Sequence, residues 1–510
     1  MGQGKNGVLV KLLNWVERVG NALPHPATLF LLLALLTALF SSFAKAMGFQ
    51  ATHPTTGEVV VPRSLLSSEG IRWAFEHVDD NFVRFPPLGL VLVAMIGIGL
   101  AEGSGLLTVL IRAVVLGAPR RLMTGALVLA GVLSHVASEA GYVILIPLGA
   151  ATFAALGRHP LAGLAAAFAG VSGGFGANLV IASVDPVLAG LSESAAHILD
   201  PSLRLSPAIN LYFGVASTVV IVLVGTWVTE RLVVPRLGSY GDSAAPPAVE
   251  PLSPQERKAL LSAGAAALVL CLFFVLSLAW PGALLRVPEQ GVLQSAFFRG
   301  LITAVMLFFF VPGLVYGWVV GTIRTDKDVL RFLTDGMKHM AGYIVLVFFA
   351  AQFVAFFGYS NVGVILAIRG AELLKSVSLT GIPLLVVFVL LSATINLFMG
   401  SASAKWAIMA PVFVPMFMLL GYHPAVTQAA FRIGDSVTNV VTPMMSYFAL
   451  IVTFVERYVP RAGIGTLISL MLPYSLIFTV AWTLFLVLWV LLGIPVGPDG
   501  PLHYTLPARP

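Results

Sequence analysis

The chain has 510 residues, of which 58% are apolar and only 10% are charged, and its mean hydropathy is +0.95. Soluble domains carry roughly 25% charged residues, so this composition excludes a soluble protein and indicates a polytopic membrane protein. The net charge of +6 does not indicate a nucleic-acid partner, because the Lys and Arg residues are scattered in short loops, where they set membrane orientation.

Nine apolar segments are long enough to cross a bilayer, which requires about 20 residues. In chain order they are 27–47, 86–111, 160–190, 207–236, 259–280, 296–321, 340–357, 424–456 and 464–493. Two further apolar stretches, about 122–157 and about 383–421, are each interrupted midway by a polar cluster that leaves halves too short to cross. We expect them to form re-entrant hairpins. The predicted fold is therefore an all-α polytopic membrane protein with nine transmembrane helices and two re-entrant helical hairpins.

An internal repeat relates the two hairpins. Residues 133–172 and 397–436 align without a gap at an offset of 264 residues, and 13 of the 40 positions are identical. The identical positions include His159-Pro160 and His423-Pro424, as well as Gly170 and Gly434. Five predicted crossings separate the hairpins, so the repeats have opposite orientation. Inverted repeats with interrupted helices are typical of secondary transporters that work by alternating access.

The distribution of charged and linker residues predicts the membrane orientation of the chain and its division into two halves. The basic N-terminal segment predicts a cytoplasmic N-terminus, the acidic loop 48–85 then lies outside, and an odd number of crossings places the C-terminus in the periplasm. We expect an N-terminal half over 1–236, a Pro-rich cytoplasmic linker over 237–258 and a C-terminal half over 259–510. The span 27–47 has no small-x-small cleavage site after it, so we expect no cleavable signal peptide.

The two hairpin tips, 134–142 and 398–406, are rich in small and hydroxylated residues. Such a tip leaves backbone groups free at membrane depth, which is tolerated only against protein or a wet cavity. Free carbonyls and hydroxyls are suitable ligands for Na⁺, and helix N-termini favour an anionic substrate, for which Ser403 is a candidate contact. The alternative is that these residues only complete the turns. The candidate cation ligands are Glu139, Asn178, Asn396 and Asp435.

The span that follows each hairpin is interrupted. The first contains three glycines and Asn178 within 172–178, and then Asp185-Pro186, which we interpret as a second interruption. In the second span, Arg432 and Asp435 are three residues apart and could form an intrahelical ion pair. Alternatively, Arg432 is available to a carboxylate and Asp435 to a cation or proton. Asp185 has no cation near it in the sequence, so it requires a distant partner, a proton or water.

Other classes of site are not supported. Ser134 and His135 lie near Glu139, but no Gly-x-Ser-x-Gly elbow accompanies them, so an intramembrane hydrolase is a weak alternative. No phosphate-binding loop and no Cys/His zinc spacing occurs in the sequence, and the single cysteine, Cys271, excludes a disulfide framework. We expect no enzyme activity and no tightly bound cofactor.

With these motifs in view, the chain resembles the AbgT family of aminobenzoyl-glutamate transporters over nearly its whole length. The most specific matches are 400–406, 423–424, 432–436, 442–443 and, in the first half, 185–186. The resemblance implies a homodimer with a substrate site between the hairpin tips and the broken helices. It also implies that Asn396 and Asp435 lie near a cation site. The residues that it places along the substrate path are Asp185, Trp406, Pro424, Arg432 and Asp435.

The resemblance predicts a secondary active transporter of p-aminobenzoyl-glutamate or sulfonamide-type aromatic antimetabolites in a bacterial inner membrane. Arg432 and Lys405 could hold the carboxylates, and the ring could lie on Trp406. An anion entering a cell that is negative inside must be driven by a cation, so we expect coupling to Na⁺ or H⁺. The candidate carriers are Asp435, Glu139 and Asp185. The main alternative is a Na⁺-coupled di- or tricarboxylate carrier of the same architecture, and a passive channel is a third option.

Overall fold

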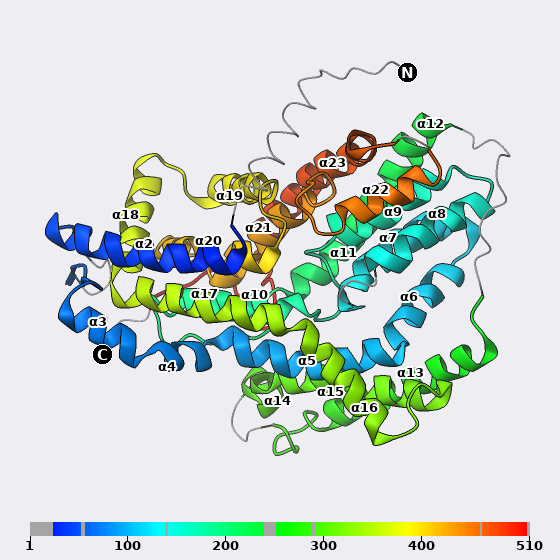
Figure 1. Ribbon diagram of the computed structural model, residues 1–510, viewed down its shortest axis with the longest axis horizontal. Helices are drawn as coiled ribbons and strands as arrows, with labels where there is room; N and C mark the ends of the chain where they lie inside the picture. Colours follow the sequence, from blue (N-terminus) through cyan, green and yellow to red (C-terminus); the bar gives the residue numbers. More distant parts are fainter. Residues whose placement is uncertain are drawn as a thin grey trace.

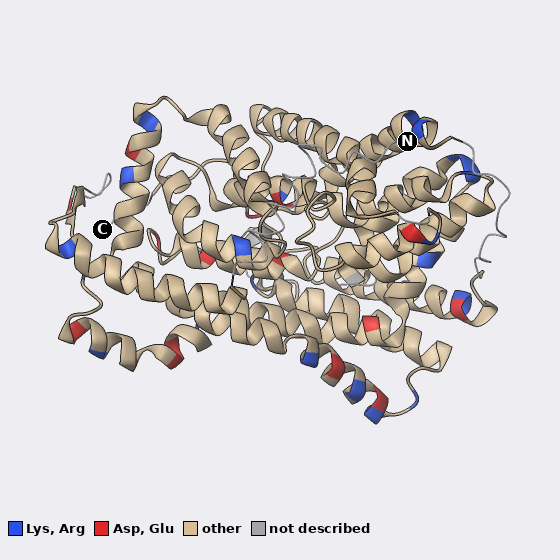
Figure 2. Ribbon diagram, turned by 45° about the horizontal axis from the view of Figure 1, so that its top comes forward, with Lys and Arg blue, Asp and Glu red and all other residues tan. Residues whose placement is uncertain are grey.

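The computed structural model describes residues 24–52, 57–137, 141–238, 251–286, 291–459 and 462–506, so residues 239–250 of the predicted linker lie outside the described part. These residues are helical apart from loops and one short antiparallel pair, β1 (Ala51–Thr52) and β2 (Val59–Val60). The helices form an elongated bundle (Figure 1). Most charged residues lie on peripheral segments and few lie in the interior (Figure 2). This distribution is expected of a protein whose outer surface faces lipid.

Within the described ranges, eight helices are long and apolar enough to cross a membrane, or nine if the bent pair α18–α19 is one span. The eight are α2 (Pro26–Ala46), α5 (Pro86–Ser104), the α11–α12 segment (Leu211–Leu237), α13 (Pro254–Leu276), α15 (Leu301–Val320), α17 (Ala341–Tyr359), α20 (Ala402–Leu419) and α23 (Ile464–Leu491). The all-α polytopic class is thereby confirmed. The predicted spans 160–190 and 424–456 are absent from this set because each is divided into short helices.

The remaining helices are shorter or more polar. They are α3 (Ser68–Glu76), α4 (Val78–Val83), α6 (Leu106–Leu116), α7 (Met123–Leu133), α8 (Ile146–Ala155), α9 (Pro160–Phe168), α10 (Val184–Ala196), α14 (Ala296–Arg299), α16 (Asp326–His339), α18 (Val362–Ser376), α19 (Gly381–Asn396), α21 (Pro424–Val437) and α22 (Phe448–Glu456). Short 3₁₀ segments occur at η1 (Arg120–Leu122), η2 (Ser134–Ala137) and η6 (Val292–Gln294). The π-helical turns are η3 (Gly141–Leu145), η4 (Ala169–Gly173) and η5 (Thr229–Val233), of which η5 divides the α11–α12 segment.

Each predicted hairpin corresponds to a pair of helices; residues 138–140 of the first tip lie outside the described part, and residues 397–401 of the second tip are not helical. The first pair is α7 and the η3–α8 segment, and the second is α19 and α20. The expectation that every half is too short to cross is wrong for α20, which has 18 residues and continues through Pro411 and Pro415. Each proline lacks the N–H for one backbone hydrogen bond and its ring crowds the preceding turn, yet α20 continues through both, and most of its residues are buried.

The helix that follows each hairpin ends early. The α9–η4 segment ends at Gly173 and α10 begins at Val184, whereas α21 ends at Val437 and α22 begins at Phe448. The interpretation of Asp185-Pro186 as a second interruption is wrong. Both residues lie in the first turn of α10, where the Asp185 carboxylate accepts the Ala182 N–H at 2.6 Å. An Asp near a helix start satisfies free N–H groups, and Pro is tolerated there, so this dipeptide begins a helix.

The structure explains why two pairs of aligned positions in the repeats hold the same residue. His159 and His423 are the N-caps of α9 and α21, and each ring accepts a backbone N–H two residues on, at 3.2 and 3.3 Å. Gly170 and Gly434 lie against the first helix of their own hairpins, where an added Cβ would collide with backbone carbonyls of α7 or α19. The broken helix therefore approaches the hairpin to backbone contact in both repeats.

The C-terminal segment 494–506, which follows the last predicted span, contacts both the start of α21 and the loop between α10 and α11. The His423 N–H donates to the Leu502 carbonyl at 3.1 Å, and the Tyr504 hydroxyl donates to the Asp200 carboxylate at 2.5 Å in the α10–α11 loop. Burial acts to raise the pKa of Asp200, but hydrogen bonds from Ser202 and Tyr504 outweigh it, and the pKa lies below its usual value. The segment thus joins the end of the second hairpin to the loop after α10.

Candidate functional site

The first buried ion pair joins the two halves of the chain. Arg432 of α21 donates through Nη1 to the Asp185 carboxylate of α10, and its Nε donates to the Gly176 carbonyl at 3.2 Å. Both side chains are buried. The distant partner that Asp185 requires is therefore Arg432, 247 residues further along the chain.

The second buried pair lies between the second hairpin and α21. The Lys405 Nζ is 2.6 Å from the Asp435 carboxylate, and it also donates to the Asn396 Oδ1 and to the Met399 carbonyl at 3.3 Å. The side chains of Lys405 and Asp435 are only 1% and 3% exposed. The alternative of an intrahelical pair between Arg432 and Asp435 is wrong, because each residue pairs with a residue of another element. The two pairs together carry no net charge.

The predicted cation ligands fall into two places. Asn396 and Asp435 lie together, and Asn396 Nδ2 also donates to the Asp435 carbonyl at 2.6 Å. The ammonium of Lys405 lies between the side-chain oxygens of these two residues, where a Na⁺ ligand pair was predicted. Asn178 lies beside the Arg432–Asp185 pair, and Glu139 lies outside the described residues. Over the described part of the chain, no three His, Cys, Asp or Glu side chains gather as a metal site.

The first helix break contacts α21, and the second break contacts the first hairpin. The Gly176 N–H donates to the Ser436 hydroxyl at 2.7 Å. A Cβ on Gly176 would lie 2.9 Å from both the Arg432 carbonyl and that hydroxyl, so this close approach requires glycine. Tyr142 of the first hairpin and Tyr447 of the second break stack at 4.7 Å between ring centroids. Each break is therefore packed against an element of the other repeat.

The predicted substrate contacts of the second hairpin are less open than the sequence indicates. Trp406 is fully buried, stacks on Phe431 at 4.4 Å and donates to the Ser192 hydroxyl at 3.0 Å. Ser403 is half-buried in the first turn of α20, and Pro424 is the buried first residue of α21. Stacking of a substrate ring on Trp406 stays a prediction, and it requires Phe431 to move.

Sequence reasoning considered His135 only as part of a hydrolase site, and it missed the buried residues Ser192 and Gln428. His135 of the first tip lies with Nε2 2.6 Å from the Val171 carbonyl and its ring against Phe175. Ser192 donates to Gln428 at 2.6 Å between α10 and α21. A signal was available for Ser192 and Gln428. Each is a hydroxyl or amide residue within a mostly apolar helix, and buried polar groups require partners.

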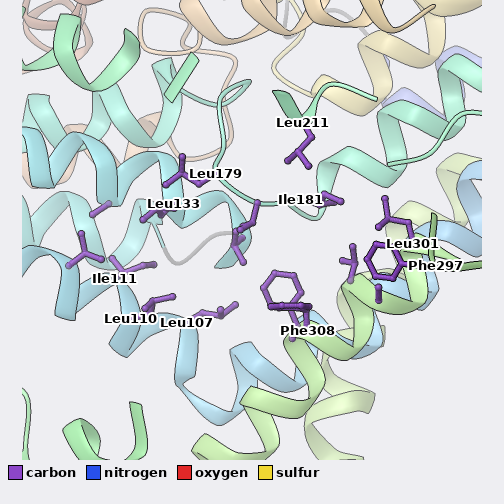
Figure 3. A pocket seen from close by; sticks show the side chains of 17 residues that line it. Leu107, Leu110, Ile111, Leu133, Leu179, Ile181, Leu211, Phe297, Leu301 and Phe308 are labelled. Atoms are coloured by element: carbon purple, nitrogen blue, oxygen red, sulfur yellow. The ribbon is translucent and has the colours of Figure 1, made fainter. Parts of the chain in front are cut away.

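Two adjoining cavities lie on either side of the residues 178–181. A small polar one of about 10 Å³ is lined by Asn178, Asp185 and Arg432. A large apolar one of about 430 Å³ lies between α6, α7, this segment and α15, and Figure 3 shows its labelled side chains, including Leu107, Leu301 and Phe308. Three apolar residues line both cavities: Val180, Ile181 and Leu211. The ion pair and the apolar cavity are therefore direct neighbours.

A family model described as the AbgT putative transporter family matches residues 11–504. The chain belongs to this family. It is 42% identical over 497 residues to the p-aminobenzoyl-glutamate transport protein of Escherichia coli K12, with 96% of each chain covered. This AbgT-family chain is therefore similar to a transporter over almost its entire length.

Two solved structures of transporters are also similar to this chain. The YdaH transporter of Alcanivorax borkumensis shares 44% identity with a TM-score of 0.88, covering 93% of this chain and all of that one. Neisseria gonorrhoeae MtrF, described as illuminating a class of antimetabolite efflux pumps, shares 44% identity with a TM-score of 0.90, covering 96% of this chain and all of that one. The AbgT family and these relatives are transporters, so the hydrolase alternative is excluded.

Proposed function

We propose that this AbgT-family protein is a secondary active transporter of p-aminobenzoyl-glutamate or related aromatic antimetabolites, and that it works by alternating access in a bacterial inner membrane. One observation supports the cargo most strongly, namely the buried guanidinium of Arg432 paired with a carboxylate of the protein itself. A guanidinium recognises carboxylates by charge-assisted hydrogen bonds. The Asp185 carboxylate thus occupies the position that a cargo carboxylate takes.

A carboxylate exchange avoids the cost of leaving Arg432 unpaired in a buried site, which is about 3–5 kcal/mol when one partner of a buried pair is removed. When the cargo binds, Arg432 turns from Asp185 to the cargo, and Asp185 is left to take up a proton or to face water at the Asn178 cavity. When the cargo leaves, the internal pair re-forms. Because Gly176 hydrogen-bonds to both Arg432 and Ser436, this exchange reaches the first helix break and the last turns of α21.

We propose H⁺ rather than Na⁺ as the coupling ion. The Lys405 ammonium already takes the oxygens of Asn396 and Asp435, so a Na⁺ at these ligands would have to displace a buried cation. A proton that moves onto Asp435 instead weakens its pair with Lys405 and makes the ammonium available to a second cargo carboxylate. The homodimer, a cytoplasmic N-terminus and a periplasmic C-terminus remain part of this proposal.

Exchange in liposomes tests the cargo without any assumption about the driving ion. Proteoliposomes loaded with unlabelled p-aminobenzoyl-glutamate are expected to take up the labelled compound, and Arg432→Ala is expected to abolish exchange. Asp185→Asn is expected to retain binding of the cargo, because it removes the competing internal carboxylate. Exchange of citrate or succinate in place of p-aminobenzoyl-glutamate would instead identify a di- or tricarboxylate carrier of the same fold.

A further inference from the structure

The apolar cavity of about 430 Å³ has the size of a small-molecule site, since such sites occupy about 300–1,000 Å³. Its lining consists entirely of aliphatic and aromatic residues, with Phe297, Phe308 and Phe309 from the α14–α15 region on one side. In Figure 3 the labelled side chains of α6, of the 179–181 segment and of α15 converge on it from separate elements. A cavity of this kind selects for an apolar or aromatic group.

The cavity is open at the helix break. Leu179 and Val180 are 38% and 47% exposed although they follow the buried Asn178 directly. Val180, Ile181 and Leu211 separate the cavity from the small polar pocket at Arg432 and Asp185. The first hairpin also reaches it, through Leu133 at the end of α7. An apolar compartment thus adjoins a guanidinium with only a short non-helical segment between them.

This arrangement fits a molecule that is aromatic at one end and carries a carboxylate at the other. We infer that the cavity between α6, α7, residues 179–181 and α15 is the subsite for the aromatic end of the cargo, with Arg432 holding its carboxylate. The inference rests on the proposed function, and it names the parts of the protein that determine which cargo is bound. The ring subsite is then this cavity and not Trp406, whose face is already covered by Phe431.

The position of the subsite also has a mechanistic consequence. Its walls come from α6 and the first hairpin on one side and from α15 on the other. A ring that fills the cavity bridges these two groups of helices, and relative movement between them changes the shape of the subsite. Binding of the aromatic end is therefore coupled to the movement that alternating access requires.

The test uses two adjacent residues of α15. Ala304 is buried and lines the cavity, whereas Thr303 is exposed and does not. Ala304→Trp fills the cavity and Thr303→Trp is its matched control. Binding of p-aminobenzoyl-glutamate and of N-acetyl-glutamate, which lacks the ring, is measured by calorimetry on the purified full-length protein in lipid nanodiscs. Burial of a Phe-sized ring predicts that the wild-type protein binds the aromatic conjugate roughly tenfold to hundredfold more tightly.

We expect Ala304→Trp to reduce that preference to about unity and Thr303→Trp to preserve it. Phe308→Ala, which removes a ring from the wall without filling the space, is expected to reduce the preference severalfold. An unchanged preference in both cavity variants would overturn the inference. If these variants also lost a co-purifying lipid, the cavity would be identified as an acyl-chain site. If the wild-type protein bound neither compound, the proposed function itself would fail, and the inference with it.

Discussion

Replacement of Lys405 by methionine removes the ammonium that pairs with the buried carboxylate of Asp435. The Nζ–Oδ1 distance of 2.6 Å corresponds to a gross attraction of about 6 kcal/mol at an effective dielectric constant of about 20. Desolvation of the two groups offsets most of that attraction while the pair is intact. Removal of one partner leaves the other charge buried and unpaired, so we expect Lys405→Met to lower the free energy of unfolding by about 3–5 kcal/mol.

The double variant Lys405→Met/Asp435→Asn removes both charges and is expected to recover more than half of the loss, because no buried charge remains unpaired. Lys338→Met is the matched control. Its Nζ lies 2.8 Å from Asp335, but the two side chains are 71% and 50% exposed, so its unfolding midpoint should not change. The assay is equilibrium unfolding in mixed micelles titrated with dodecyl sulfate. A Lys405→Met midpoint equal to that of Lys338→Met would refute the electrostatic reasoning.

Two further variants test the packing and the C-terminal segment. Gly434→Ala would place a Cβ against the Val389 carbonyl of α19 and is expected to abolish exchange, whereas Gly465→Ala, which meets no atom within 4 Å, is expected to retain it; equal exchange in both would contradict the close packing. Tyr504→Phe should lower stability at pH 7, because the folded-state pKa of Asp200 is depressed below its unfolded value of about 3.9. That contribution is present above the unfolded pKa and is lost as the pH falls through the folded pKa. The difference in unfolding midpoint between Tyr504→Phe and wild type should therefore shrink from pH 7 to pH 3, and a constant difference would show that Asp200 is not responsible.

Much of the fold could be predicted from the sequence, because a bilayer imposes its length on apolar segments and because helix breakers interrupt them visibly. The alignment showed that Gly170 and Gly434 are the same residue but not why. Each glycine allows backbone contact between a broken helix and its hairpin. The prolines of α20 mark the limit of this inference. The polar cluster at the second tip predicted halves too short to cross, whereas α20 has 18 residues and continues through both prolines.

The site residues were recognisable by type, since charged groups within apolar spans require a reason. Their partners were not recognisable. Sequence spacing brought Arg432 and Asp435 together as neighbours on one helix, whereas folding pairs Arg432 with Asp185 and Asp435 with Lys405. Such pairings depend on how separate elements close in space. The same holds for the stacking of Trp406 on a neighbouring helix and for the apolar cavity, which no single segment encodes.

We propose that the protein accumulates an aromatic carboxylate at the expense of a proton gradient. The most direct test measures uptake of labelled p-aminobenzoyl-glutamate into proteoliposomes under an imposed pH gradient without Na⁺, and under a Na⁺ gradient at constant pH. We expect accumulation under the pH gradient alone, with loss of that accumulation in Asp435→Asn. Accumulation that requires the Na⁺ gradient, or accumulation that persists in Asp435→Asn, would contradict it.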